Sequence, residues 1–148
     1  MPDPLDPQQD AVYRAQREVF ADEKEERSVV ELQAFVNDFV SEPWFRARYP
    51  HLKSVDVKDG RGASDALSGS DGRSMLLPRG TRYQFIAVHE TGHLVDVSGG
   101  EDHGAVFCGL FLFMVGKVYD LKRKSRLALR FRKYDVRWDH KIAKYGRP

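Results

Sequence analysis

The chain has 148 residues, enough for one domain with a normal hydrophobic core, and its 41% hydrophobic and 31% charged residues exclude an intrinsically disordered protein. Its single cysteine, Cys108, excludes a disulfide framework and a cysteine-based zinc ribbon. The net charge is only +2, but residues 117–148 carry 12 Lys and Arg against 3 Asp and Glu, which gives +9.

The chain carries no pattern for secretion or for a membrane span. Its first four residues, Met-Pro-Asp-Pro, have neither the basic nor the apolar region of a signal peptide. The apolar run from Val106 to Val115 is too short to cross a bilayer and is typical of a buried helix. We therefore expect a cytoplasmic protein without a membrane partner.

The N-terminal third is expected to be helical. Residues 1–7 are rich in proline and aspartate, and we expect them to be frayed. Apolar residues at helical spacing predict a helix over residues 8–22, and the polar residues up to Arg27 predict an exposed linker. Ser28 and Glu31 fit a capping box, which opens a second helix.

A small sheet is expected in the middle of the chain. The second helix should end before Pro43, and a connection over residues 44–50 follows it. Short strands are predicted over residues 55–60, more weakly over 63–67, and again over 74–77. We therefore expect one α+β domain spanning the whole chain, with a mainly antiparallel sheet packed on the helices.

Three helices are expected in the C-terminal half. Thr81 fits as the N-cap of a central helix over residues 82–97. A helix over residues 104–119 is apolar on nearly all sides. An amphipathic helix is predicted up to residue 134, with Ser125 as its N-cap. Residues 135–148 are expected to form an irregular basic tail.

The sequence His89-Glu90-Thr91-Gly92-His93 lies inside the central helix. Two histidines four residues apart on a helix point the same way and can bind one ion at about 2.0–2.1 Å per Zn–N bond. Glu90, about 100° around the helix, can reach a metal-bound water without becoming a ligand. This H-E-x-x-H pattern is typical of metal-dependent hydrolases in which the glutamate is the general base.

A third ligand is needed to complete a catalytic zinc site. His103 follows His93 after nine residues, enough chain to turn back and present a side chain at the start of the next helix. Glu101 and Asp102 compete for this role, and we favour His103 because a packed helix entrance fixes its direction. The two carboxylates, and Asp96, could instead orient a ligand imidazole.

The alternative for the motif is a pair of ordinary surface histidines that share a helix face by chance. Three of the chain's five histidines belong to the constellation, which argues for a metal site. A hydrolase of this type also needs a donor for the developing oxyanion. The candidates flanking the motif are Arg79, Arg82, Tyr83 and Tyr119.

The motif, followed by Asp102-His103-Gly104-Ala105-Val106-Phe107, resembles the SprT-like and related mini-gluzincin metallopeptidases. In these, H-E-x-x-H precedes an H-G-x-x-aromatic signature that opens the next helix. The lead-in Met75-Leu76-Leu77-Pro78 and the N-terminal Val12-Tyr13-Arg14 resemble more closely still a family of small actinobacterial and phage metallohydrolases.

This resemblance implies a zincin-like α+β fold, zinc binding by His89, His93 and His103, and Glu90 as the catalytic acid/base. It also implies that a strand beside the active-site helix can hold an extended peptide or protein substrate. No zinc ribbon follows the core, so the DNA-linked role of SprT-like proteins is not expected here.

Two other functions remain open. Tris-histidine endoribonucleases also take two ligands from an H-x-x-x-H helix, but their third histidine typically follows after a shorter gap. A non-catalytic binding module stabilised by its metal is the other alternative. The basic C-terminal tail could contact a polyanion weakly, although a solvated helix face is the simpler interpretation. Iron, cobalt, nickel or manganese could replace zinc at such nitrogen ligands.

Overall fold

The helices and strands form two groups in the computed structural model, which describes residues 3–69 and 71–147. One unit comprises residues 23–95, and the other comprises residues 1–22 together with 96–148. Each unit builds its own set of packed elements, and the sequence motif His89–His93 belongs to the first of them.

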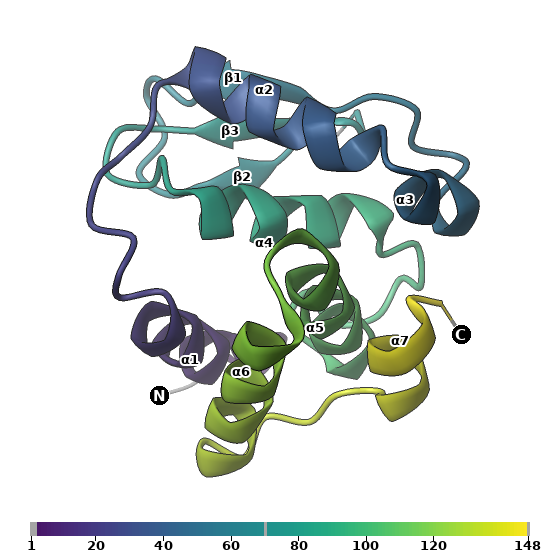
Figure 1. The fold of residues 1–148 in the computed structure, drawn as a ribbon. Helices are drawn as coiled ribbons and strands as arrows, with labels where there is room; N and C mark the ends of the chain where they lie inside the picture. Colours follow the sequence, from purple (N-terminus) through teal and green to yellow (C-terminus); the bar gives the residue numbers. More distant parts are fainter. Residues whose placement is uncertain (1–2, 70, 148) are drawn as a thin grey trace. The chain divides into compact units, whose positions relative to one another are not determined.

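The unit of residues 23–95 consists of a small sheet and helices packed against it. Helix α2 packs against β1 and against α4, and α4 packs against β2 and β3 (Figure 1). The elements are α2 (Val29–Val40), α3 (Pro43–Arg48), β1 (Asp56–Asp59), β2 (Leu67–Ser68), β3 (Ser74–Leu77) and α4 (Gln84–Val95).

Helix α2 begins with the predicted capping box. The Ser28 hydroxyl accepts a hydrogen bond from the Glu31 backbone N–H at 3.0 Å, and the Glu31 carboxylate accepts one from the Ser28 N–H at 3.2 Å. The helix ends before Pro43, as predicted. The prediction of a simple connection after it is wrong, because Pro43 opens α3 and the ring of Phe45 packs into the core.

The sheet has the strand order β1-β3-β2. Four residues of β1 pair with β3 in parallel, whereas only Leu67 and Ser68 of β2 pair with β3 in the antiparallel sense. The prediction of a mainly antiparallel sheet is therefore wrong, and β2 begins where the weak strand over residues 63–67 was expected to end. Alternating apolar residues predict a strand, but they do not specify which neighbour it pairs with.

Acidic side chains of the segment before α2 bind the start of α4. The Glu23 carboxylate accepts a hydrogen bond from the Phe85 N–H, and Glu26 accepts from the N–H groups of Gly80 and Arg82. These residues were expected to form an exposed linker. Thr81 is not the helix cap that the sequence predicts, because its hydroxyl donates to the Pro78 carbonyl. Glu23, remote in the sequence, instead accepts from one N–H of the first helical turn, and Glu26 fixes the segment before it.

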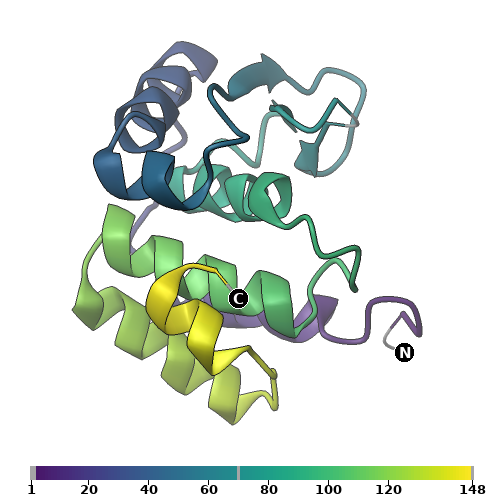
Figure 2. The ribbon, with the colours of Figure 1, turned by 90° about the vertical axis from the view of Figure 1, so that its right-hand side faces the viewer.

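The second unit consists of four helices. Helix α5 packs against α6 and α7, and α1 packs against α6. Figure 2 shows α7 lying against α5. Every residue from Phe107 to Val115 is buried, which confirms the prediction of a buried apolar helix. The elements are α1 (Gln9–Val19), α5 (Ala105–Val118), α6 (Leu121–Lys133) and α7 (His140–Tyr145).

Two predictions for the C-terminal segment are wrong. Asp120, rather than Ser125, caps α6 by accepting a hydrogen bond from the Arg123 N–H. The segment after residue 134 was expected to be irregular, but its described part contains α7, which Asp139 caps and which is followed by Gly146 in the left-handed conformation at φ 81°. The turn residues of this short helix were present in the sequence, but six residues are too few to give a clear periodicity.

One of the basic residues of the C-terminal segment, Arg123, forms an ion pair within this unit. The Arg123 guanidinium binds both carboxylate oxygens of Asp22 at 2.9 Å and also donates to the Val19 carbonyl. Arg123 therefore ties the start of α6 to the end of α1. Among the described residues, no helix combines the length and the apolar character that crossing a bilayer requires.

Residues 3–7 are not frayed as predicted, whereas Met1 and Pro2 lie outside the described residues. The Asp6 N–H donates to the Asp3 carbonyl, and the Asp6 carbonyl accepts from the Gln9 N–H at the start of α1. The side chain of Asp6 is buried. Its role is described with the candidate site below.

The contact between α5 and α7 yields a stability prediction. A methyl group added at Gly109 of α5 would lie 2.8 Å from the Asp139 carbonyl oxygen and 3.1 Å from Cβ of Ile142. We expect Gly109→Ala to lower the free energy of unfolding by about 1–3 kcal/mol, as overpacking does, despite the better helix propensity of alanine. Denaturant unfolding of both proteins measures this difference.

Gly116 of the same helix is the matched control. The nearest atom to an added methyl there is Cδ of Lys124, at 2.9 Å, on a side chain that can move aside. Gly116→Ala should be neutral or stabilising by up to ~1 kcal/mol. Equal stability changes in the two variants would show that the backbone contact at Gly109 is not restrictive.

Candidate metal centre

Helix α4 carries the two histidines of the motif on successive turns. Its apolar residues bury it on several sides, so that residues 87–92 are all buried in a continuous run. His89 is 1% exposed and His93 is half-buried. The two side chains are therefore not a surface pair, and the alternative of two ordinary surface histidines does not describe them.

The two rings are separated by the distance expected for ligands of one ion. The Nε2 atoms of His89 and His93 lie 3.2 Å apart. Two nitrogens bound to one tetrahedral zinc at about 2.0–2.1 Å would lie about 3.3 Å from each other. The helix therefore presents both nitrogens at a spacing that one metal ion fits.

His103 precedes α5 and is held by residues of the N-terminal segment. Its ring Nδ1 lies 2.6 Å from Asp6 Oδ2, and its backbone N–H donates to Asp6 Oδ1 at 3.1 Å. The carbonyl of His103 accepts a hydrogen bond from the Gln8 side-chain amide at 2.9 Å. The ring makes edge contacts with Tyr13 and Phe107, each with a centroid distance of 5.1 Å.

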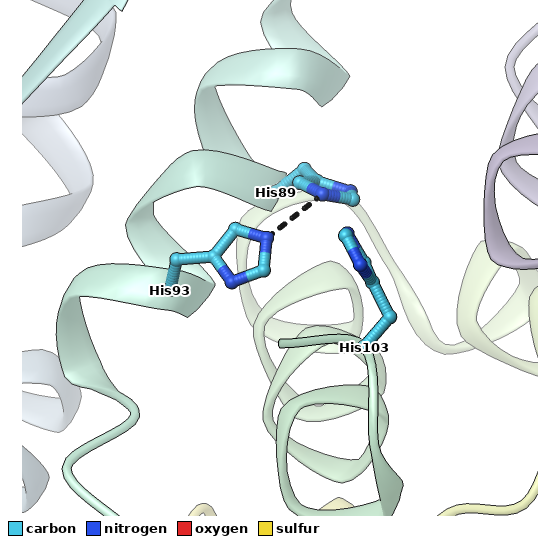
Figure 3. Close-up of side chains that lie close together, drawn as sticks. All are labelled: His89, His93 and His103. Carbon is cyan, nitrogen blue, oxygen red and sulfur yellow. Dashed lines mark hydrogen bonds between the residues drawn. The ribbon is translucent and has the colours of Figure 1, made fainter. Parts of the chain in front are cut away.

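His89, His93 and His103 form a group in which one ligand atom of each ring lies within 4.8 Å of the others (Figure 3). Such a buried three-histidine group could hold a metal ion. Of the described residues, Glu101 and Asp102 do not belong to it, and both are exposed. The choice of His103 over these two carboxylates as the third ligand stays a prediction.

Glu90 is buried beside the histidine pair. Its carboxylate Oε2 lies 3.8 Å from Nε2 of His89, beyond hydrogen-bond distance. Burial away from water raises the pKa of Glu90 from its ordinary value of 4.5 to about 8. A carboxyl with such a pKa exchanges its proton near neutral pH, as general acid/base chemistry requires.

Arg82 and Tyr119 are committed to other contacts. Arg82 donates to the Leu77 carbonyl and pairs with Asp59 at 2.9 Å, so that it fastens α4 to the sheet. Tyr119 follows the last residue of α5, about 20 Å along that helix from its start beside His103. These contacts and positions assign neither residue to the histidine group.

The other two oxyanion candidates lie before and at the start of α4. The ring of Tyr83 stacks on that of Phe85, with centroids 5.9 Å apart. Arg79 is exposed. These contacts assign neither residue to the site.

Sequence reasoning missed Asp6, which contacts His103 across 97 positions of the chain. No periodicity or motif marks an aspartate that acts so far from its own sequence neighbours. Two residues that were predicted to orient an imidazole have other surroundings. Asp96 accepts hydrogen bonds from the backbone N–H and the hydroxyl of Ser98, and Asp102 is exposed. The sequence therefore identified the ligand candidates but not the carboxylate that supports one of them.

Comparison with known proteins adds no relative. No protein-family model matches the chain, and searches of curated proteins and of solved structures likewise find no match. The resemblance to SprT-like metallopeptidases therefore stays a prediction that rests on the motif.

The raised pKa of Glu90 predicts a pH-dependent stability in the metal-free protein. As the pH rises from 4.5 to about 8, the unfolded chain loses the Glu90 proton while the folded protein keeps it. The free energy of unfolding should therefore fall across this window and level off above it. Glu90→Gln removes this loss, so that above pH ~8 the variant should be more stable by on the order of 5 kcal/mol.

Urea unfolding with a chelator present, at about pH 5 and about pH 9, measures this effect. The difference between the two proteins should be small at the lower pH and large at the higher one. Comparing variant with wild type cancels the titration of the histidines, which both proteins share. A stability difference independent of pH would contradict the raised pKa.

Proposed function

We propose that the protein is a zinc-dependent hydrolase that cleaves peptide bonds, with His89, His93 and His103 as ligands and Glu90 as the catalytic acid/base. One observation carries the proposal: the buried three-histidine group has a buried carboxyl beside it, 3.8 Å from a ligand nitrogen. A structural metal site needs no such carboxyl. A hydrolytic one does.

The donor set favours zinc. Three imidazole nitrogens suit zinc well and leave a fourth position of a tetrahedron for water. Magnesium, calcium and manganese prefer ligand sets rich in carboxylate oxygens, which the three histidines do not provide. Zinc held by these three histidines would act as a Lewis acid and lower the pKa of a water molecule that it binds.

Glu90 supplies the proton transfers of the proposed reaction. Its carboxylate takes a proton from the attacking water and passes it to the nitrogen of the leaving amine. Burial holds this group away from bulk water, and a cation beside it favours the ionised form that accepts the proton. The same residue can therefore accept and release a proton within one turnover.

The peptide substrate is proposed from the motif and from the position of α4 in its unit. A glutamate directly after the first ligand is the habit of metallopeptidases, and the H-G-x-x-aromatic sequence from His103 to Phe107 adds to the resemblance. In the unit of residues 23–95, α4 packs against β2, an edge strand of the sheet. An edge strand beside the motif helix is where an extended peptide can pair. A zincin-like fold and a cytoplasmic location belong to the same proposal.

The first experiment measures hydrolysis of unfolded casein by the zinc-loaded protein, with and without a chelator. We expect cleavage that the chelator abolishes. Glu90→Gln should retain zinc and lower the rate by at least ~100-fold, because general acid/base catalysis contributes about 10²–10⁴-fold. Mass spectrometry of the intact protein under native conditions measures the bound zinc.

Glu101→Gln is the matched control, since Glu101 is exposed and lies two residues before His103. It should cleave casein at the wild-type rate. Single-stranded RNA serves as the second substrate: chelator-sensitive cleavage of RNA but not casein would replace the proposal with a nuclease. A zinc-loaded protein that cleaves neither substrate would favour a binding module.

A further inference from the structure

Asp6 binds His103 with both of its carboxylate oxygens. Oδ1 accepts the backbone N–H at 3.1 Å, and Oδ2 lies 2.6 Å from the ring Nδ1. Both side chains are buried. A carboxylate that hydrogen-bonds to both the backbone and the ring of one residue fixes the rotamer of that side chain. Any other rotamer would break the contact with the ring.

The contact also selects the tautomer of the imidazole. A carboxylate only accepts hydrogen bonds, so that Nδ1 of His103 must carry the proton. In the neutral ring the lone pair then resides on Nε2, the nitrogen on the other side of the ring. A metal ligand needs a lone pair on the nitrogen that faces the ion, and this tautomer provides it.

Apolar contacts on the ring strengthen this selection. The edges of Tyr13 and Phe107 contact His103 at interplanar angles of 73° and 79°. A ring flip between these neighbours would place a carbon against Asp6 and leave the buried carboxylate without its ring partner. Such a loss of a buried, charge-assisted hydrogen bond is unfavourable.

Anchoring of the same chain segment is a separate task, which Gln8 performs. Its amide group donates to the carbonyls of His103 and Arg137, and its oxygen accepts the Arg137 N–H at 2.6 Å. None of these bonds touches the imidazole. Asp6 and Gln8 therefore hold the same residue by different parts, the ring in one case and the main chain in the other.

We propose that Asp6 is the positioning residue of the metal centre, orienting the His103 ring and keeping its proton on Nδ1 so that Nε2 is the ligand atom. This inference rests on the metal site of the proposed function, but not on hydrolysis. It assigns a role in metal binding to the segment before α1, which the sequence pattern predicts to be frayed.

The test compares the zinc affinity of three variants with that of the wild type by competition with a chromogenic chelator. Asp6→Asn should weaken zinc binding by about 10–100-fold, the usual effect of losing the carboxylate behind a ligand histidine. Gln8→Ala removes the main-chain anchor, and Asp3→Asn removes the same charge three residues earlier. Asp3→Asn should bind zinc close to the wild-type affinity, and Gln8→Ala should weaken zinc binding less than Asp6→Asn does.

A second readout needs no metal. In the metal-free wild type, the nitrogen NMR shifts of His103 should report one tautomer with the proton on Nδ1. In Asp6→Asn they should report a mixture, while circular dichroism shows that the variant is folded. Should Asp6→Asn prevent folding, Asp6→Glu replaces it in both measurements. Its additional methylene group displaces the carboxylate from Nδ1, so that weaker zinc binding and a mixture of tautomers are again expected.

The outcomes separate this inference from the proposed function. Weaker zinc binding and a mixed tautomer in Asp6→Asn support the role of Asp6 even when the wild type cleaves no substrate. Unchanged affinity and tautomer in Asp6→Asn overturn it even when the wild type is an active peptidase. An equal loss of affinity in Gln8→Ala also overturns it, because anchoring of the segment would then be sufficient.

Discussion

A buried imidazole is stable only when both of its ring nitrogens have polar partners, and this constraint governs the arrangement around the histidines. His89 and His103 are each at most 3% exposed, in a chain whose core is otherwise mainly aliphatic and aromatic. Asp6 is the partner of one nitrogen of His103. For the nitrogens of His89 and His93 that lie 3.2 Å apart, a shared cation is a partner that satisfies both at once.

The helix that carries the motif is held at its start by carboxylates from outside it. Glu23 and Glu26 accept hydrogen bonds from backbone N–H groups at and before the first turn of α4, and Arg82 fastens the same region to the sheet. These contacts define the position of α4 within its unit. Ligands that project from a fixed helix keep their spacing without relying on the ion to order them.

Glu90 illustrates the conflict between stability and chemistry. An ionisable carboxyl at 5% exposure is unfavourable for folding, and burial raises its pKa to about 8. A glutamine or a leucine at this position would not carry that disadvantage. The proposed function accounts for this disadvantage, because a buried carboxyl beside the ligand candidates is what its proton transfer would need.

Both ends of the chain contribute to the surroundings of His103, although neither carries a recognisable motif. The N-terminal segment supplies Asp6 and Gln8, and Gln8 also binds the main chain of Arg137. Helix α7 packs on α5, the helix that His103 precedes, through the close contact at Gly109. The segments described as frayed and irregular on sequence grounds are thus parts of the unit that supports this histidine.

The sequence by itself determined the local features: the buried helix α5, the capping box of α2, the strand β3 and the three histidines with Glu90. Each of these depends on spacing or on capping residues within one short segment of the chain, and such patterns are visible in a single sequence. Only the tertiary structure decided the parallel pairing of β1 with β3, the role of Glu23 and Glu26 at α4, and the contact of Asp6 with His103. These are partnerships between residues far apart in the chain. A polar side chain can satisfy its hydrogen bonds with many different partners, and packing selects one of them.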